Sequence, residues 1–360
     1  MAIIIYFSSA TLLAFILITL LIPVIIRLSR HFEWYDHIDH RKIHSGEISQ
    51  LGGVGIFLVV VIVSTLFIIF EQFFPRIVIE KLDFPPGFLF IFGGAVLIHL
   101  LGLIDDFSNL NATPKFIVQI FAALLVTSGG FSVGIFSIPF IWQDISLGYF
   151  TIPITALWIV GITNAINLID GMDGLAGGIA GIAAFFYGMI FLLEGYFLAA
   201  LISLILFGAI LGFLVFNFPP ATIFMGDSGA LLIGFLLAVL PLLEIPQPVS
   251  TFSLIPAVTI LFIPIMDTFF AIIRRKVKRE AIGKPDNEHI HHKFLRLGLN
   301  HKQILSLIYG ITLLFGIITI AEFYLNKTIG AALAISTWIV SLIFYIFLDN
   351  KKQQNNPVKE

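Results

Sequence analysis

Two asparagines and two aspartates interrupt an otherwise apolar chain in the stretch GITNAINLIDGMDGLAGG, residues 161–178. Asn164, Asn167 and Asp170 are three residues apart, so they share one face if they occupy the last turns of a helix. The glycines that follow let the chain turn and bring its backbone close to a ligand. The spacing therefore predicts a polar site at the end of a helix.

Carboxylates recur in two other motifs, because GLIDDFSNL contains Asp105 and Asp106, and FMGDSG contains Asp227. Adjacent side chains of a helix point in different directions, so we expect Asp105 and Asp106 to have different partners. Oxygen ligands in a chain without cysteine favour Mg²⁺, with Mn²⁺ as the alternative. Mg²⁺ uses one or two carboxylates together with substrate phosphates. The expected substrate is therefore a phosphate ester.

A phosphate ester needs positive charge around it, and the sequence has neither a GxxxxGK[ST] loop nor a GxGxxG motif to hold it. Lys115, the basic segment that starts at Arg274 and the histidines of EHIHHKF, namely His289, His291 and His292, are the candidate donors. The helical spacing of His289 and His292 also allows a metal site. The basic surroundings favour hydrogen bonding to phosphate or sugar instead.

The remainder of the chain indicates an all-α, polytopic integral membrane protein with about eleven transmembrane helices. Hydrophobic residues make up 58% of the sequence, charged residues 12%, and the mean hydropathy is +1.03. Runs near the length of about 20 residues that crosses a bilayer lie at 3–28, 53–70, 88–103, 116–126, 152–169, 175–193, 197–216, 230–243, 255–273, 304–321 and 329–347. The first run lacks a basic n-region and a cleavage site, which indicates a retained helix.

The distribution of Lys and Arg predicts the orientation. With the N-terminus outside, the segments 27–50, 104–115, 274–303 and 349–360 are cytoplasmic and contain 17 of the 20 basic residues. The positive-inside rule then places the C-terminus and all the polar motifs on the cytoplasmic side. Carboxylates that converge near a bilayer surface indicate a site by default.

We expect one transmembrane domain at 1–348 and a disordered cytoplasmic tail at 349–360. The outer segment SGGFSVGIFSIPFIWQDISLGYF has turn and alternating residues that could form a small periplasmic β-hairpin. Four acidic residues outside the motifs are interpreted as helix caps or solvent-facing groups: Asp36, Asp39, Asp286 and Glu288.

Six motifs in sequence order resemble the polyprenyl-phosphate N-acetylhexosaminyl-1-phosphate transferase family, which includes the phospho-MurNAc-pentapeptide transferases. They are DHRKIHSGEISQLGGVGIF, LIDDFSNLNATPKFIVQ, NAINLIDGMDGLAGG, FNFPPATIFMGDSGALLIGF, PIMDTFFAIIRR and HIHHKFLRLGL, and the resemblance runs from the first to the last of them along nearly the whole chain. The HIHH form resembles the branch that uses UDP-N-acetylglucosamine. The muramyl branch usually carries three consecutive histidines, whereas position 290 is Ile.

The resemblance implies transfer of an N-acetylhexosamine 1-phosphate, GlcNAc 1-phosphate first, from a UDP-sugar to undecaprenyl phosphate, with release of UMP. It implies a bacterial cytoplasmic membrane and an active site that faces the cytoplasm. Carried over by position, it implies these roles: Mg²⁺ held by Asn167 and Asp227, uracil contacted by Asp173 and Phe224, and phosphate contacted by Lys115. It also implies that Asp105 or Asp106 acts on the acceptor phosphate, and that the sugar-phosphate end of the donor is lined by His289, His291 and His292. Three further positions of the substrate site are implied by their motifs: Asn164, Asp170 and Asn217.

Several alternatives remain open from the sequence. An aspartate could form a phospho-enzyme, or the lipid phosphate could attack directly, which we favour because the acceptor carries its own anionic oxygen. A phospho-MurNAc-pentapeptide transferase, a proton-coupled transporter and a catalytically silent scaffold are the competing functions. The exact sugar, the downstream polymer (lipopolysaccharide or teichoic acid among others) and the oligomeric state stay undetermined. A homodimer is compatible with the sequence, and no nucleic-acid partner is expected.

Overall fold

The structure is a computed structural model that describes residues 2–35, 48–73, 82, 84–138, 142–243, 249–250, 254–280, 288–325 and 327–355. Asp36, Asp39 and Asp286, interpreted above as caps or solvent-facing groups, lie outside the described residues, as does much of the first family-like motif. Glu288 is described, and its carboxylate lies 3.8 Å from Lys278 Nζ, but its side chain is only 18% exposed, so it is more enclosed than a solvent-facing group.

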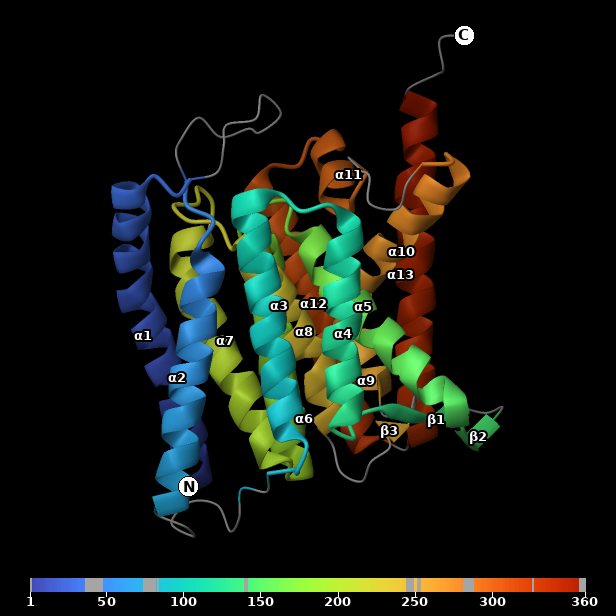
Figure 1. Ribbon diagram of the computed structural model, residues 1–360. Helices are drawn as coiled ribbons and strands as arrows, with labels where there is room; N and C mark the ends of the chain where they lie inside the picture. The colour runs from blue at the N-terminus through green and yellow to red at the C-terminus, as the bar shows by residue number, and fades with distance from the viewer. Residues whose placement is uncertain are drawn as a thin grey trace.

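Helices dominate the described chain, which confirms an all-α, multi-pass membrane protein (Figure 1). They are α1 (Ala2–Phe32), α2 (Gly52–Phe73), α3 (Phe88–Ser108), α4 (Ala112–Ser128), α5 (Thr151–Ile169), α6 (Leu175–Glu194), α7 (Phe197–Asn217), α8 (Gly226–Val239), α9 (Ile255–Ile260), α10 (Phe262–Val277), α11 (Ile290–Arg296), α12 (His301–Tyr324) and α13 (Lys327–Asn355). Within the described residues, 9 helices are long and apolar enough to cross a membrane. The shorter α4 and the pair α9 and α10 account for the remaining predicted runs.

The ninth predicted run, 255–273, is two helices and not one. α9 ends at Ile260 and α10 begins at Phe262, with Leu261 between them. Pro264 explains the break, because proline lacks the N–H that would bond to the carbonyl of residue 260 and its ring clashes there. The eighth predicted run, 230–243, also differs from the structure. α8 starts four residues earlier, at Gly226, and is followed by a 3-10 turn at Leu240–Leu243.

The predicted hairpin is present, and it belongs to a small three-stranded sheet. β1 (Val133–Ile138) pairs antiparallel with β2 (Trp142–Ser146), and Ile135 lies opposite Ser146. A short strand that the sequence did not predict, β3 (Val249–Ser250), pairs parallel with β1, so the strand order is β2-β1-β3. In Figure 1 the sheet lies at the same end of the bundle as the N-terminus.

α8 is the helix on which the site is built, and it lies among α2, α3 and α5. A Cβ on Gly53 of α2 would collide with the backbone nitrogen of Gly229 of α8, so only glycine permits this approach. Gly226 begins α8 with φ of 70°, and a Cβ there would collide with the carbonyl of Gln50 and approach the Asp106 carboxylate. Glycines therefore set the depth of α8 in the bundle.

The polar motifs gather at one end of the bundle. The turn from α3 to α4 and the short helix α11 lie at the end opposite to the sheet and the start of α1, which is also where α13 ends (Figure 1). The start of α1 and the end of α13 thus lie at opposite ends of the bundle, which agrees with an odd number of crossings. α13 continues to Asn355, past the predicted domain boundary at 348, and residues 356–360 of the predicted tail lie outside the described chain.

Candidate functional site

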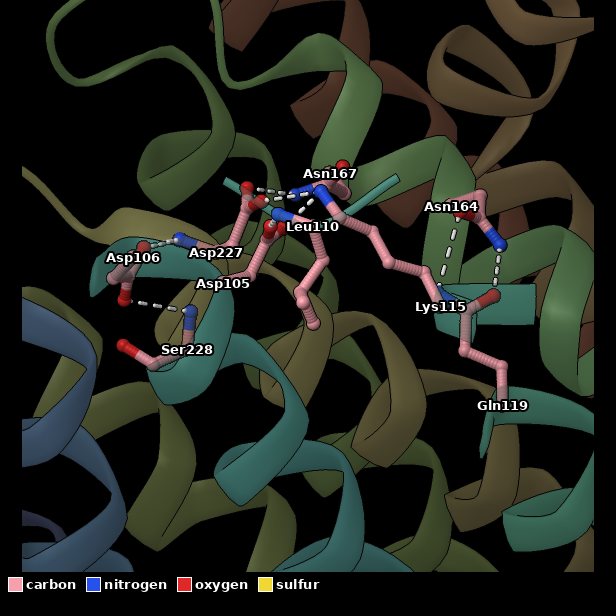
Figure 2. Close-up of polar contacts among 9 residues, drawn as sticks. All are labelled: Asp105, Asp106, Leu110, Lys115, Gln119, Asn164, Asn167, Asp227 and Ser228. Carbon is pink, nitrogen blue, oxygen red and sulfur yellow. Dashed lines mark hydrogen bonds and ion pairs between the residues drawn. The ribbon is translucent and has the colours of Figure 1, made fainter. Parts of the chain in front are cut away.

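Four side chains from four helices form one polar cluster, which we define as Asp105 (α3), Lys115 (α4), Asn167 (α5) and Asp227 (α8). Lys115 Nζ forms ion pairs with Asp105 Oδ2 and, at 3.1 Å, with Asp227 Oδ2 (Figure 2). Asn167 Nδ2 donates to Asp227 Oδ1 at 2.7 Å. The side chains of Asp227 and Lys115 are 34% and 25% exposed, so the cluster is open to the surface.

The adjacent aspartates have different partners, as their adjacency predicts. Asp105 is buried, and its Oδ1 accepts the backbone N–H of Leu110 at 2.7 Å. Asp106 instead accepts the backbone N–H groups of Asp227 at 2.6 Å and Ser228 at 3.1 Å (Figure 2). These are free N–H groups of the first turn of α8, so Asp106 caps a helix 121 residues away in the chain. The cap carboxylate comes from a neighbouring helix.

Asn164 lies one turn before Asn167 on α5, and it is paired with a residue that the sequence analysis did not single out. Its Nδ2 donates to Gln119 Oε1 at 2.6 Å and to the Val160 carbonyl at 2.8 Å. Gln119 Nε2 returns a weaker bond to Asn164 Oδ1 at 3.4 Å. Since Gln119 follows Lys115 by one turn of α4, this amide pair fixes α4 against α5 beside the polar cluster (Figure 2).

Asp170 ends α5 and remains half-buried. Within the described part of the chain its carboxylate has no hydrogen-bond partner. Burial, followed by the negative charge of Asp227 and of two further aspartates, raises the pKa of the Asp170 carboxyl to about 7. A half-buried carboxyl with acidic neighbours and no donor is placed to accept a proton or a cation.

Asp173 and Asn217 hold the backbone around the site. Asp173 Oδ2 accepts the Ala221 N–H at 3.1 Å. Asn217 Oδ1 accepts the Gly174 N–H at 2.9 Å, and its Nδ2 donates to the Ile223 carbonyl at 2.9 Å. Both atoms of the Asn217 amide are thus used by the protein, so the structure gives this residue a bracing role between the α5–α6 turn and the α7–α8 loop.

The α7–α8 loop is also paired with the segment before α2. Phe224 N–H donates to the Ser49 carbonyl at 2.8 Å, and Gly52 N–H donates back to the Phe224 carbonyl at 3.0 Å. Gly53 N–H then donates to the Met225 carbonyl at 2.8 Å. The glycine-rich motif LGGVGIF therefore positions the loop that leads into Asp227 at the start of α8.

The histidine segment, which we define as residues 289–292, begins with a histidine held by the protein. His289 Nδ1 lies 2.8 Å from Asp267 Oδ2, and Asp267 Oδ1 accepts the Ile290 N–H at 2.9 Å. An imidazole that places one nitrogen on a carboxylate keeps the other for a ligand. Asp267 lies in the apolar motif PIMDTFF, and a lone carboxylate in such a run was the signal that could have identified it.

His291 and His292 complete the segment. The ring centroids of the two histidines lie 4.1 Å apart, and the His291 ring is parallel to that of His289 at 6.1 Å. A Cβ added to Gly171 would lie 2.8 Å from the His291 ring, so the segment packs directly on the α5–α6 turn beside Asp170. His291 is buried, and among the residues that the structure describes neither of its ring nitrogens has a hydrogen-bond partner. The ring therefore has its hydrogen-bonding capacity unused.

Burial, reinforced by the charge of His292, lowers the pKa of His291 from 6.5 to about 3. The unfolded chain then binds a proton at this position between pH 6.5 and 3 that the folded chain does not, so stability falls as pH falls through that window. At pH 5 the loss is about 2 kcal/mol. We expect His291→Gln to flatten the decline of Tm between pH 7 and 5, whereas the exposed His31→Gln leaves it unchanged; equal slopes would contradict a neutral buried His291.

The described residues contain no group of three or more His, Cys, Asp or Glu side chains placed around one metal. The polar cluster nevertheless suits a hard cation, because it places two carboxylates, those of Asp105 and Asp227, around one positive charge, which is that of Lys115. Asn167 uses its amide nitrogen toward Asp227, which leaves its oxygen as a ligand. Two carboxylate or amide oxygens are what Mg²⁺ takes from a protein when phosphates supply others.

Comparison with known proteins gives one family and close relatives. The model of glycosyl transferase family 4 matches residues 88–244. A protein of Bacillus subtilis (strain 168) named "Probable undecaprenyl-phosphate N-acetylglucosaminyl 1-phosphate transferase" is 37% identical over 303 residues, which are 84% of this chain and 81% of that protein.

Two further relatives have different names. "Decaprenyl-phosphate N-acetylglucosaminephosphotransferase" of Mycobacterium tuberculosis (strain ATCC 25618 / H37Rv) is 31% identical over 295 residues, covering 75% of this chain and 70% of that protein. "Phospho-N-acetylmuramoyl-pentapeptide-transferase" of Halalkalibacterium halodurans is 30% identical over 326 residues, covering 86% of this chain and 94% of that protein. The first relative has the higher identity and carries the name of an N-acetylglucosaminyl 1-phosphate transferase.

Proposed function

We propose that this chain, which belongs to glycosyl transferase family 4, transfers GlcNAc 1-phosphate or a related N-acetylhexosamine 1-phosphate from a UDP-sugar to undecaprenyl phosphate. The observation that carries the proposal is the polar cluster, where Lys115 joins two carboxylates at one end of a membrane bundle. The name of the Bacillus subtilis relative supports the acceptor and the sugar. A site at the membrane end suits an acceptor whose chain stays in hydrocarbon while its phosphate reaches water.

In the proposed reaction an anionic oxygen of the lipid phosphate attacks the sugar-linked phosphorus of the donor. The phosphoanhydride bond to the other phosphorus breaks, and UMP leaves with that electron pair. Such a transfer needs positioning and charge neutralisation more than covalent help from the protein. Lys115 supplies one fixed positive charge beside the reacting phosphates, and the histidines of the histidine segment supply hydrogen bonds.

The contacts of the paired aspartates favour direct attack over a phospho-enzyme. Asp106 accepts two backbone N–H groups of α8, which engages both of its oxygens. Asp105 is buried with one oxygen on Leu110 N–H and the other on Lys115. A nucleophile needs an accessible oxygen, so we assign both aspartates to holding Lys115 and α8 in place for the acceptor phosphate.

We propose Mg²⁺ as the cofactor, with Mn²⁺ able to replace it. Asp227 and the amide oxygen of Asn167 would hold the ion. Asp170 lies close enough to Asp227 for the two carboxylates to interact electrostatically. When bound, the ion would neutralise the charge of the donor pyrophosphate.

We further propose that the site faces the cytoplasm of a bacterial cytoplasmic membrane. The excess of Lys and Arg in the segments at the site end supports this orientation through the positive-inside rule. A proton-coupled transporter is less well supported, because transporters place their ionisable residues near the bilayer midplane. Here the described polar residues of the motifs lie at one end of the bundle (Figure 1).

The direct test is a donor panel with purified protein, undecaprenyl phosphate and Mg²⁺. We expect UMP and a lipid diphosphosugar from UDP-N-acetylglucosamine, dependent on the lipid and abolished by EDTA. Turnover with UDP-MurNAc-pentapeptide alone would reassign the chain to the muramyl reaction. Absence of UMP from every UDP-N-acetylhexosamine, with folded protein and metal present, would reject the transferase.

A further inference from the structure

The last membrane helix, α13, carries one large side chain that is fully buried although most of the helix faces outward. α13 has the smallest buried share of the 9 candidate spans, so most of its surface faces outward. Tyr345 on this helix is nevertheless fully buried and is the largest such side chain in the described structure. A lipid-facing helix needs no phenol inside the protein to cross a membrane, so the contacts of Tyr345 point to a role there.

Tyr345 contacts one stripe of α10. Its hydroxyl donates to Asp267 Oδ1 at 3.0 Å and accepts from Arg274 at 3.1 Å. Its ring stacks on Phe270 with a centroid distance of 4.5 Å and an angle of 16° between the planes. Asp267, Phe270 and Arg274 are separated by three and four residues, so they share a face of α10. The phenol thus joins α13 to a face of α10 through both its ring and its hydroxyl.

The same phenol also reaches the segment that carries the histidines. Asp267, which accepts the Tyr345 hydroxyl, also accepts Ile290 N–H and pairs with His289. On the other side of the histidines, Lys293 Nζ lies 3.4 Å from the centroid of the Tyr345 ring. Tyr345 therefore contacts the structure around the histidine segment at both of its ends.

We propose that Tyr345 is a positioning residue, which orients the histidine segment for the sugar-phosphate end of the donor by fixing Asp267 and, through it, His289. This inference rests on the proposed function and adds the last helix to the parts that build its site. The hydroxyl holds the Asp267 carboxylate in one rotamer, and that carboxylate then fixes the imidazole and the first N–H of α11. Small displacements of such groups lower catalysis even where the substrate is not touched.

Tyr345→Phe is the sharpest test, because it keeps the ring, the stacking on Phe270 and the contact with Lys293. We expect the Kd and KM for the UDP-sugar to rise roughly tenfold, the range expected when one hydrogen bond to a charged group is lost. The KM for undecaprenyl phosphate should stay unchanged. Tyr149→Phe is the matched control, since Tyr149 is fully exposed in the turn between β2 and α5, and it should behave like the wild type.

A double-mutant cycle separates positioning from general stability. Donor binding is titrated for Tyr345→Phe, His289→Gln and the double variant, so the comparison does not depend on residual turnover. If Tyr345 acts through His289, adding Tyr345→Phe to His289→Gln should weaken binding by less than twofold. A residue that only stabilises the packing of α13 would cause the same loss in both backgrounds.

The outcomes distinguish this inference from the function on which it rests. Wild-type turnover with an unchanged donor Kd in Tyr345→Phe would overturn the positioning role and leave the transferase intact. Equal, multiplicative losses in the cycle would also overturn it. A wild-type protein that neither binds nor turns over any UDP-N-acetylhexosamine would overturn the proposed function, and the role of Tyr345 with it.

Discussion

Asp227→Asn is expected to lower kcat roughly a thousandfold, in line with the removal of one preorganised charge from a reacting centre. Asp227 on α8 accepts hydrogen bonds from Lys115 on α4 and Asn167 on α5, so its carboxylate joins three helices. The fold should persist, because the N–H groups of the first turn of α8 are capped by Asp106 and not by Asp227 itself.

UMP release under saturating substrates measures this effect, and Tm in detergent reports the fold. Glu33→Gln is the matched control, because Glu33 is an exposed acid at the end of α1. Near-normal turnover in Asp227→Asn, or inactivity that only follows unfolding, would refute the role of this carboxylate in the reaction.

Lys115→Gln should have the second large effect, a loss of roughly a hundredfold in kcat/KM. Its ammonium is shared by Asp105 and Asp227, so removing it leaves two carboxylates facing each other without their common counter-charge. The Tm should therefore fall as well, since Asp105 is buried and loses an ion pair.

Lys115→Arg separates charge from shape, because it keeps the charge but replaces a compact ammonium with a planar guanidinium. We expect it to restore Tm and only part of the activity. Lys302→Gln, an exposed lysine on α12, is the control and should change neither. An unaltered kcat/KM in Lys115→Gln would show that the bridge between the two aspartates has no part in the reaction.

The helices long enough to cross a membrane were accessible to sequence reasoning because each has a long apolar run, and a bilayer demands such runs. Helix ends were less accessible. The break at Leu261 depends on Pro264, whose effect lies four residues upstream, and β3 consists of just Val249 and Ser250, too short to show alternation.

The members of the site were predicted by residue type, but their partners were not. Nothing local to Asp106 shows that it caps α8, since the N–H groups it accepts lie beyond four intervening helices. Asn217 resembled a ligand contact by its motif, whereas its amide bridges two backbone segments. Asp267 and Gln119 act through neighbours brought close only by folding. The side chains that face a substrate and those that hold the backbone in place are of the same residue types, so only their positions in the fold distinguish the two roles.

The backbone pairing between the segment before α2 and the α7–α8 loop has a consequence for the enzyme in its membrane. α1 and α2 are among the less buried spans, so lipid contacts much of their surface. Lipid-facing helices change their tilt when the thickness of the hydrocarbon layer changes. Because Gly53 N–H is bonded to the Met225 carbonyl, two residues before Asp227, a change in the tilt of α2 would reach the carboxylate through the main chain. Acyl-chain length would thus tune the geometry around Asp227 without any lipid touching it.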